Sequence, residues 1–421
     1  MMIELVNTGS ELMLGRVLNT HQQWLCRQLA DLGYVVSRQV AVPDAGVDIQ
    51  AAVREALGRA DLVLTTGGLG PTSDDLTRDL IAGMLGRELR ENAQVLSHLA
   101  QFFDVRQRPM PPRTRVQALV PDGALVLPNA NGTAPGLALE VEPNLFRSGK
   151  GSWLIMLPGP PRELRPMFQD AVVPLLKRVL PLEAPFVCRT LRATGIGESV
   201  VEERVRRPLE ALVKRGLQIG YCARPGQVDV RLAAQNDQAQ ELVGKAAAIV
   251  QRRLGNFLYS DGEEELEATI VQLLAQRKLT LAVAESCTGG YVAHRLTNVP
   301  GASAVLLAGL VTYSNAAKQK FLGVREQTLE ANGAVSEPVA LEMAEGARRQ
   351  TGADYALSVT GIAGPTGGSE TKPVGTVYLG LAGPGETRVE RRFNPFERET
   401  FKQVTAQQAL DLLRRHLPPA Q

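Results

Sequence analysis

The chain of 421 residues is long enough for two or three domains, at about 150 residues per domain. With 44% hydrophobic and 21% charged residues, it has the composition of an ordinary globular protein, which excludes disordered, collagen-like and membrane-spanning classes. The net charge of +2 lacks the basic excess of a nucleic-acid binder, so we expect neither nucleic acid nor a membrane as a direct partner.

The N-terminus and the cysteines indicate the compartment. Glu4 and Glu11 precede the first basic residue, Arg16, so the basic n-region of a secretory signal is missing and we expect a cytoplasmic protein. The four cysteines have no CxxC spacing and the four histidines no HExxH spacing. We therefore predict neither a disulfide framework nor a zinc site, and carboxylates remain the only candidate metal ligands.

Residues 1–180 alternate short apolar runs with amphipathic stretches, which predicts an α/β domain. Strands are expected at 3–6, 34–42, 61–65 and 153–157, and helices at 17–32, 47–57 and 162–180. Strands separated by helices favour parallel pairing with right-handed crossovers.

Residues 181–260 predict a small α+β module, with strands at 187–193 and 228–233 and a helix at 238–254. The module contains a Gly-Ile-Gly-Glu turn at 195–198 but no cluster of catalytic residue types. We expect it to have a structural or linking role.

Residues 261–421 predict a second α/β domain. A helix at 266–276 and a strand at 280–284 are followed by a helix from an N-cap at Ser336 to about residue 350, and then by a strand at 355–359.

A glycine-rich loop at 65–77 is the strongest local signal in the first domain. It joins a strand to a helix start, where free N–H groups favour phosphate or another anion. Its spacing is neither GxGxxG nor a Walker A motif. Asp74 and Asp75 suit a divalent cation that bridges to phosphate, although either could instead cap the helix. Loops at 8–11, 131–136 and 157–163 could converge with this one.

Ser286 follows a predicted strand in the last domain and precedes two glycines. A serine hydroxyl needs a base to become nucleophilic, and Lys318 can serve if burial lowers its pKa. The residues alone leave open a loop that only holds phosphate, and a Tyr313 that is only a core tyrosine.

Several long motifs together resemble those of the CinA family (competence/damage-inducible protein A) over almost the entire chain. They lie at 67–75, 132–136, 157–161, 284–290, 311–315, 333–336 and 361–365.

The resemblance implies an N-terminal domain of the molybdopterin-binding fold that acts as a metal-dependent ADP-ribose pyrophosphatase, followed by a KH-like middle module. Asp74 and Asp75 would hold a divalent cation such as Mg²⁺, and a monovalent cation is an optional further cofactor. The implied substrate-binding residues are Gly9, Glu11, Gly67, Gly68, Gly70, Thr72, Gly132, Thr133, Gly159 and Arg162.

The resemblance also implies a C-terminal nicotinamide mononucleotide deamidase that needs no cofactor. Ser286 would be the nucleophile, and Lys318 and Tyr313 the pair that handles protons. The implied substrate-binding residues are Thr288, Gly289, Gly290, Ser314, Thr360, Gly361 and Arg398, with backbone N–H groups of 288–290 as oxyanion donors.

The chain departs from the family after Arg398, where relatives often carry further arginines and this chain has Phe401, Lys402 and Gln403. Lysine replaces arginine as a point charge but not as a bidentate fork. Two alternatives stay open: an N-terminal domain that binds molybdopterin or a nucleotide without hydrolysing it, and an adaptor in DNA uptake or repair. We expect a symmetric dimer.

Overall fold

The computed structural model describes residues 1–418 and has a mixed α/β fold. The chain divides into two compact units, the first spanning Met1–Phe186 and the second beginning at Val187. The domain boundaries expected after residues 180 and 260 remain predictions. No helix among the described residues is long and apolar enough to cross a membrane.

The first unit has one six-stranded sheet, ordered β2-β1-β3-β8-β7-β6. Its elements are β1 (Ile3–Thr8), α1 (Ser10–Met13), α2 (Thr20–Asp31), β2 (Arg38–Val42), α3 (Gly46–Leu57), β3 (Leu62–Thr66), α4 (Thr77–Met84), β4 (Leu89–Glu91), α5 (Ala93–Asp104), the 3₁₀ helix η1 (Pro112–Ala118), β5 (Leu119–Pro121), β6 (Leu125–Leu127), β7 (Gly136–Val141), β8 (Ser152–Leu157), α6 (Pro161–Met167), the π-helical turn η2 (Phe168–Val172) and α7 (Val173–Val179).

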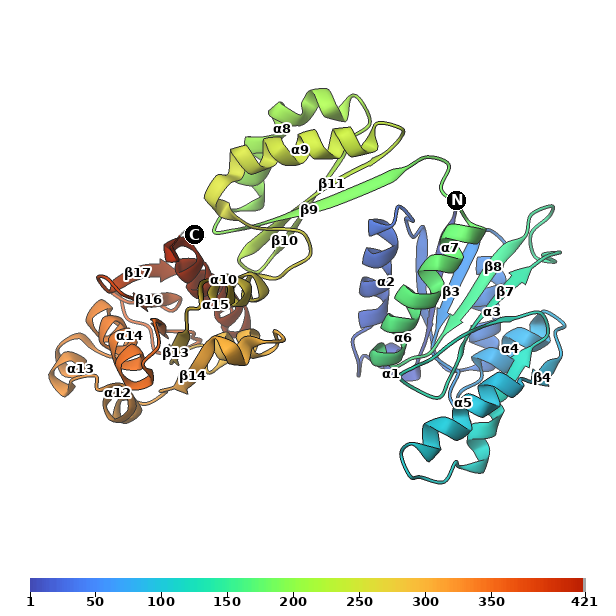
Figure 1. The fold of residues 1–421 in the computed structure, drawn as a ribbon, viewed down its shortest axis with the longest axis horizontal. Helices are drawn as coiled ribbons and strands as arrows, with labels where there is room; N and C mark the ends of the chain where they lie inside the picture. The colour runs from blue at the N-terminus through green and yellow to red at the C-terminus, as the bar shows by residue number, and fades with distance from the viewer. Residues whose placement is uncertain (419–421) are drawn as a thin grey trace. The chain divides into compact units, whose positions relative to one another are not determined.

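Helices cover both faces of this sheet (Figure 1). One apolar cluster joins α3, α4 and α5 to one face, and a second joins α2, α6 and α7 to the other. Four neighbouring strands, β2, β1, β3 and β8, pair in parallel as predicted. Their carboxyl ends therefore meet at one edge, which is where open α/β sheets place their ligand sites.

Three details of the first unit differ from the sequence-based prediction. Strands β7 and β6 pair antiparallel, because they follow each other without a crossover helix. The helix expected at 17–32 begins at Thr20 as α2, and Leu18, expected within it, is 84% exposed. Residues 34–37 lie before β2 and are not part of it.

The second unit begins with a four-stranded sheet, ordered β10-β11-β9-β12, that is packed against two helices. Its elements are β9 (Phe186–Thr194), α8 (Glu198–Val213), β10 (Gln218–Arg224), β11 (Gln227–Gln235), α9 (Ala239–Leu254), the 3₁₀ helix η3 (Gly255–Phe257) and β12 (Leu258–Asp261).

A five-stranded sheet, ordered β14-β13-β15-β16-β17, forms the rest of this unit. Its elements are α10 (Leu266–Arg277), β13 (Leu281–Glu285), α11 (Tyr291–Thr297), the 3₁₀ helix η4 (Ala302–Ala304), β14 (Leu306–Val311), α12 (Asn315–Leu322), α13 (Glu326–Asn332), α14 (Glu337–Thr351), β15 (Tyr355–Gly361), β16 (Thr376–Ala382), β17 (Arg388–Phe393) and α15 (Arg398–His416).

The five-stranded sheet is covered on both faces. Helices α10, α11 and α15 share one apolar cluster with it, and α12, α13 and α14 share another. Strands β14, β13 and β15 are parallel, whereas β16 and β17 pair antiparallel as a hairpin. The predicted N-cap Ser336 does precede α14, but its hydroxyl donates to the Gly333 carbonyl and does not cap the helix.

Two candidate active sites

The first candidate site is a pocket of about 370 Å³ at the carboxyl ends of β1, β3 and β8. It is lined by Thr8, Gly9, Glu11, Asp44, Gly67, Gly68, Leu69, Gly70, Pro71, Asp74, Asp75, Gln117, Thr133, Ala134, Pro158, Gly159, Pro160 and Glu163. The loops that follow these strands thus line the same pocket, as expected for parallel strands whose carboxyl ends lie at one edge of the sheet.

The pocket floor at Gly68 admits only glycine. Its φ of +67° lies in the left-handed region, and an added Cβ would stand 2.0 Å from the Thr77 hydroxyl oxygen. The Thr77 N–H donates to the Gly68 carbonyl at 3.1 Å, which ties the loop to the start of α4.

Asp75 has a definite structural contact within this loop. Its carboxylate accepts hydrogen bonds from the Thr72 backbone N–H at 2.9 Å and the Thr72 hydroxyl at 2.5 Å. Helix α4 starts at Thr77 with Leu76 as its N-cap and has no side-chain cap, so neither Asp74 nor Asp75 caps it. The helix-cap alternative for the two aspartates is therefore wrong.

The electrostatics of this pocket suit a cation. Five carboxylates line it, those of Glu11, Asp44, Asp74, Asp75 and Glu163, and no lysine or arginine is among its lining residues. Within residues 1–418, no three His, Cys, Asp or Glu side chains converge as a ready-made metal site. A divalent cation here would thus take only part of its oxygen shell from the protein, as Mg²⁺ commonly does when it also contacts phosphate and water.

The second candidate site lies at the carboxyl ends of β13 and β14. Ser286 directly follows β13, and its backbone N–H donates to the Val359 carbonyl of β15 at 2.9 Å. Lys318 projects from α12 and is only 1% exposed. Its Nζ lies 3.0 Å from Ser286 Oγ and donates to the carbonyl oxygens of Thr312 at 2.8 Å and Tyr313 at 3.4 Å.

Burial lowers the pKa of the Lys318 amine, because desolvation disfavours its charged form. A neutral amine has two N–H donors and one lone pair. The carbonyls of Thr312 and Tyr313 can occupy the two donors, which leaves the lone pair for the Ser286 hydroxyl. The arrangement therefore places a base within hydrogen-bond reach of a nucleophile.

The turn after Ser286 leaves two backbone N–H groups unused. The Gly289 N–H donates to the Ser286 carbonyl at 3.1 Å, and the Gly290 N–H donates to the Glu285 carboxylate at 3.0 Å. The N–H groups of Cys287 and Thr288 donate to no oxygen of the described chain, and the Cys287 N–H contacts only the thiol of its own residue. Of the three donors expected at 288–290, only the one on Thr288 is free.

Three parts of the chain match known families. Residues 4–178 match "Probable molybdopterin binding domain", residues 188–260 match "Damage-inducible protein CinA KH domain", and residues 263–417 match "CinA C-terminal domain". A CinA-like protein of Akkermansia muciniphila is 44% identical over 97% of this chain and 95% of its own. The chain belongs to the CinA family.

Further members are similar at comparable levels. A putative competence-damage inducible protein of Moorella thermoacetica is 43% identical over 99% of both chains. The solved structure of the competence/damage inducible protein CihA from Agrobacterium tumefaciens is 42% identical, covers 36% of this chain and 92% of that one, and has a TM-score of 0.35.

In this CinA-family chain, most residues predicted for the N-terminal site line one pocket. Thr72, Gly132 and Arg162 are not among the lining residues, and the Arg162 side chain is 78% exposed. The sequence analysis missed Asp44 and Gln117 as lining residues. Gln117 lies on η1, far along the chain from the glycine loop, and no local motif marks it. Asp44 could have been found, since it closely follows the end of β2.

At the C-terminal site, four of the remaining predicted side chains have definite partners, whereas the buried Thr288 hydroxyl has none in the described part of the chain. The Tyr313 hydroxyl accepts a hydrogen bond from Arg398 Nη2 at 2.9 Å, and Arg398 Nη1 donates to the Gly364 carbonyl at 2.9 Å. The Ser314 hydroxyl accepts from the Ala317 N–H and so caps α12, and the Thr360 hydroxyl donates to the Ala334 carbonyl at 2.8 Å. The roles expected for these residues stay predictions.

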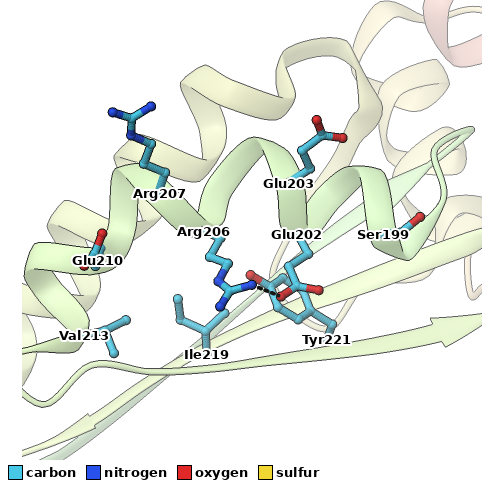
Figure 2. Close-up of a pocket in the computed structure, with 9 residues that line it drawn as sticks. All are labelled: Ser199, Glu202, Glu203, Arg206, Arg207, Glu210, Val213, Ile219 and Tyr221. Atoms are coloured by element: carbon cyan, nitrogen blue, oxygen red, sulfur yellow. Dashed lines mark ion pairs between the residues drawn. The ribbon is translucent and has the colours of Figure 1, made fainter.

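A third hollow lies in the KH-like module, between α8 and the edge strand β10 (Figure 2). Figure 2 shows Glu202 and Arg206, which pair at 3.7 Å, beside Tyr221 and Ile219. The residues that line this groove include no His, Cys or Lys, so it has no pair comparable to Ser286 and Lys318.

The steric fit of the glycine loop yields a testable contrast between two glycines of the same unit. We expect Gly68→Ala to lower the free energy of unfolding by about 2–4 kcal/mol, because it combines a left-handed φ with a collision at Thr77. In the matched control Gly83→Ala, on α4, the added Cβ meets nothing within 4 Å and should stabilise by about 0.5–1 kcal/mol. Urea unfolding followed by the fluorescence of Trp24 and Trp153 reports on this unit, and equal effects of the two variants would contradict the assignment.

Proposed function

We propose that the C-terminal domain is an amidase that converts nicotinamide mononucleotide to nicotinic acid mononucleotide and ammonia. The observation that carries the proposal is the 3.0 Å contact between Lys318 Nζ and Ser286 Oγ, both on buried residues. The family resemblance supplies the substrate, and the lysine and serine pair supplies the chemistry that an amide requires.

In the first half of the reaction, Ser286 Oγ attacks the carboxamide carbon while Lys318 Nζ accepts the hydroxyl proton. The N–H groups of Cys287 and Thr288 are the free donors available for the negative charge that develops on the amide oxygen. The C–N bond then breaks as Lys318 returns the proton to the leaving nitrogen, and ammonia departs from an acyl-enzyme.

In the second half, a water molecule attacks the acyl carbon with Lys318 again as the base, and the released acid leaves Ser286 free. Tyr313 serves beside Lys318 in proton transfer, its hydroxyl oriented by Arg398. Arg398 holds the substrate phosphate with guanidinium N–H groups that Tyr313 and Gly364 do not use.

We further propose that the N-terminal domain hydrolyses ADP-ribose to AMP and ribose 5-phosphate. Support comes from its 370 Å³ pocket, which gathers backbone from the glycine loop and five carboxylates. Asp74 and Asp75 would hold a divalent cation, which when bound would neutralise the diphosphate charge. The loops at Gly9 and Gly159 would contact the nucleotide. Together the two activities would salvage breakdown products of pyridine nucleotides.

The amidase proposal predicts that purified full-length protein releases ammonia from nicotinamide mononucleotide. Ser286→Ala should lower kcat at least about 1,000-fold, because it removes the nucleophile, and should leave ADP-ribose hydrolysis unchanged. Coupled detection of ammonia provides the measurement. A wild-type protein that releases no ammonia would overturn the amidase assignment and favour a domain that only binds its ligand.

A second prediction concerns pH. Since Lys318 must be neutral to accept a proton and burial lowers its pKa, kcat/KM for the amide should rise with pH along a limb centred below 10.5, the ordinary lysine value. Lys318→Arg should be inactive over the whole range, because a guanidinium does not lose its proton. A limb centred at or above 10.5 would argue against Lys318 as the base.

For the N-terminal site, we expect ADP-ribose hydrolysis to require Mg²⁺ and to stop with EDTA. Asp74→Asn should lower that rate about 100-fold or more while ammonia release persists, since the carboxylate is needed for the cation. Asp48→Asn makes the same charge change on an exposed position of α3 and should have no effect. Binding of ADP-ribose without turnover by the wild type would instead support a domain that binds nucleotides without hydrolysing them.

A further inference from the structure

Glu285, the last residue of β13, carries a buried carboxylate that the amidase mechanism above does not use. Its residue is 1% exposed, and its two oxygens accept three backbone hydrogen bonds. The donors are the N–H groups of Gly290 at 3.0 Å, Val292 at 3.1 Å and Ala293 at 2.8 Å.

Backbone amides, with no paired arginine or lysine, stabilise this charge. Among the ion pairs of the described residues, none involves Glu285. All three N–H groups belong to the start of α11, where the helix dipole also favours a negative charge. The carboxylate is therefore a multidentate clamp that closes the turn 286–290 onto the helix.

The backbone of Glu285 is fixed as firmly as its side chain. It pairs with Val311 of β14 and Val359 of β15, and its carbonyl accepts the Thr312 N–H at 2.8 Å. The clamp thus joins β13, an inner strand of the sheet, to the turn that contains Ser286, and the neighbouring strand β14 leads to Thr312, a partner of Lys318.

The clamp also decides which backbone N–H groups remain free. It takes up the Gly290 N–H and constrains Gly290 at a φ of +94°, while the N–H groups of Cys287 and Thr288 donate to no oxygen of the described chain, the first contacting only its own thiol. These two are the only N–H groups of the turn 287–290 that are available to a ligand.

We propose that Glu285 is a positioning residue of the amidase, one whose carboxylate holds the turn so that the Cys287 and Thr288 N–H groups bind the oxyanion. The proposal rests on the amidase function proposed above. Glu285 acts through the turn and touches no reacting atom. A neutral glutamine at this position offers one acceptor oxygen in place of two and directs an NH₂ group at backbone donors, so the turn loses at least one of its three anchors.

Glu285→Gln should lower kcat about 10- to 100-fold with KM within about twofold of wild type, because the loss concerns charge that appears only in the transition state. The acid limb of the pH profile should stay in place, since burial and Cys287, and not Glu285, shift the pKa of Lys318. Steady-state ammonia release by the full chain, measured across pH well below the melting temperature, gives all three quantities.

Glu342→Gln is the matched control. Glu342 on α14 also uses its carboxylate to accept a backbone N–H, that of Arg325, and it also anchors a short helix in the same domain. It should lower the melting temperature but leave kcat unchanged. Equal losses of kcat in both variants would mean that Glu285 only stabilises the fold, and would overturn the proposal.

The variant Glu285→Asp separates an effect on catalysis from a failure to fold. If Glu285→Gln does not fold, the aspartate variant retains the charge with a side chain one methylene shorter, and a fall in kcat at constant KM supports the proposal. Wild-type kcat in either folded variant overturns it. A wild-type protein that releases no ammonia is a different result, because it removes the amidase function itself.

Discussion

The buried contact between the Lys318 amine and the Ser286 hydroxyl is the constraint around which the C-terminal domain is organised. An ammonium group held at 1% exposure would lose most of its hydration, so the fold favours the neutral amine. Two neighbouring parallel strands bring the partners together: the serine directly follows β13, and the segment after β14 supplies carbonyl oxygens and then the helix of the lysine. The contact between Lys318 and Ser286 thus requires both the pairing of β13 with β14 and the position of α12, which together bury the amine.

The two candidate sites share the same topology but differ in the charges of the side chains that they gather. Both lie where parallel strands end, yet the N-terminal pocket gathers five carboxylates and no basic side chain, whereas the C-terminal site buries a single amine among backbone groups. Under the proposed functions, the first would take a cation from outside, whereas the second would use groups of the protein alone. This contrast follows from the side chains placed after the strands and not from the fold.

Sequence patterns predicted the elements whose conformation is specified by their own local residues. The apolar runs that became β1, β3, β8, β13 and β15 were recognisable, as was the glycine loop, because local chemistry specifies them. Strands β10, β16 and β17 were not predicted: β10 and β17 are sheet edges without a buried residue, whereas β16 is almost entirely buried and its apolar run was overlooked. The serine and lysine pair was suggested by chemistry, but its 3.0 Å contact joins residues 32 positions apart in the sequence and forms only when β13 pairs with β14. Gln117 reaches the first pocket by tertiary packing, with no local motif to mark it, whereas the position of Asp44 after β2 was a signal that was overlooked.

Helix α15 is enclosed on nearly every side, with residues 404–407 and 409–413 all buried. Part of its surface packs into the core of its own domain, and part meets the KH-like module, where Gln407 bonds Thr194 and Arg414 bonds the Leu258 carbonyl. The helix begins at Arg398, beside Tyr313. The module therefore covers part of α15 that would otherwise be exposed to solvent. A chain that encoded the C-terminal domain without this module would need polar residues on the face of α15 that here contacts the module. The sequence of α15 therefore indicates whether the domain is built with the module or without it.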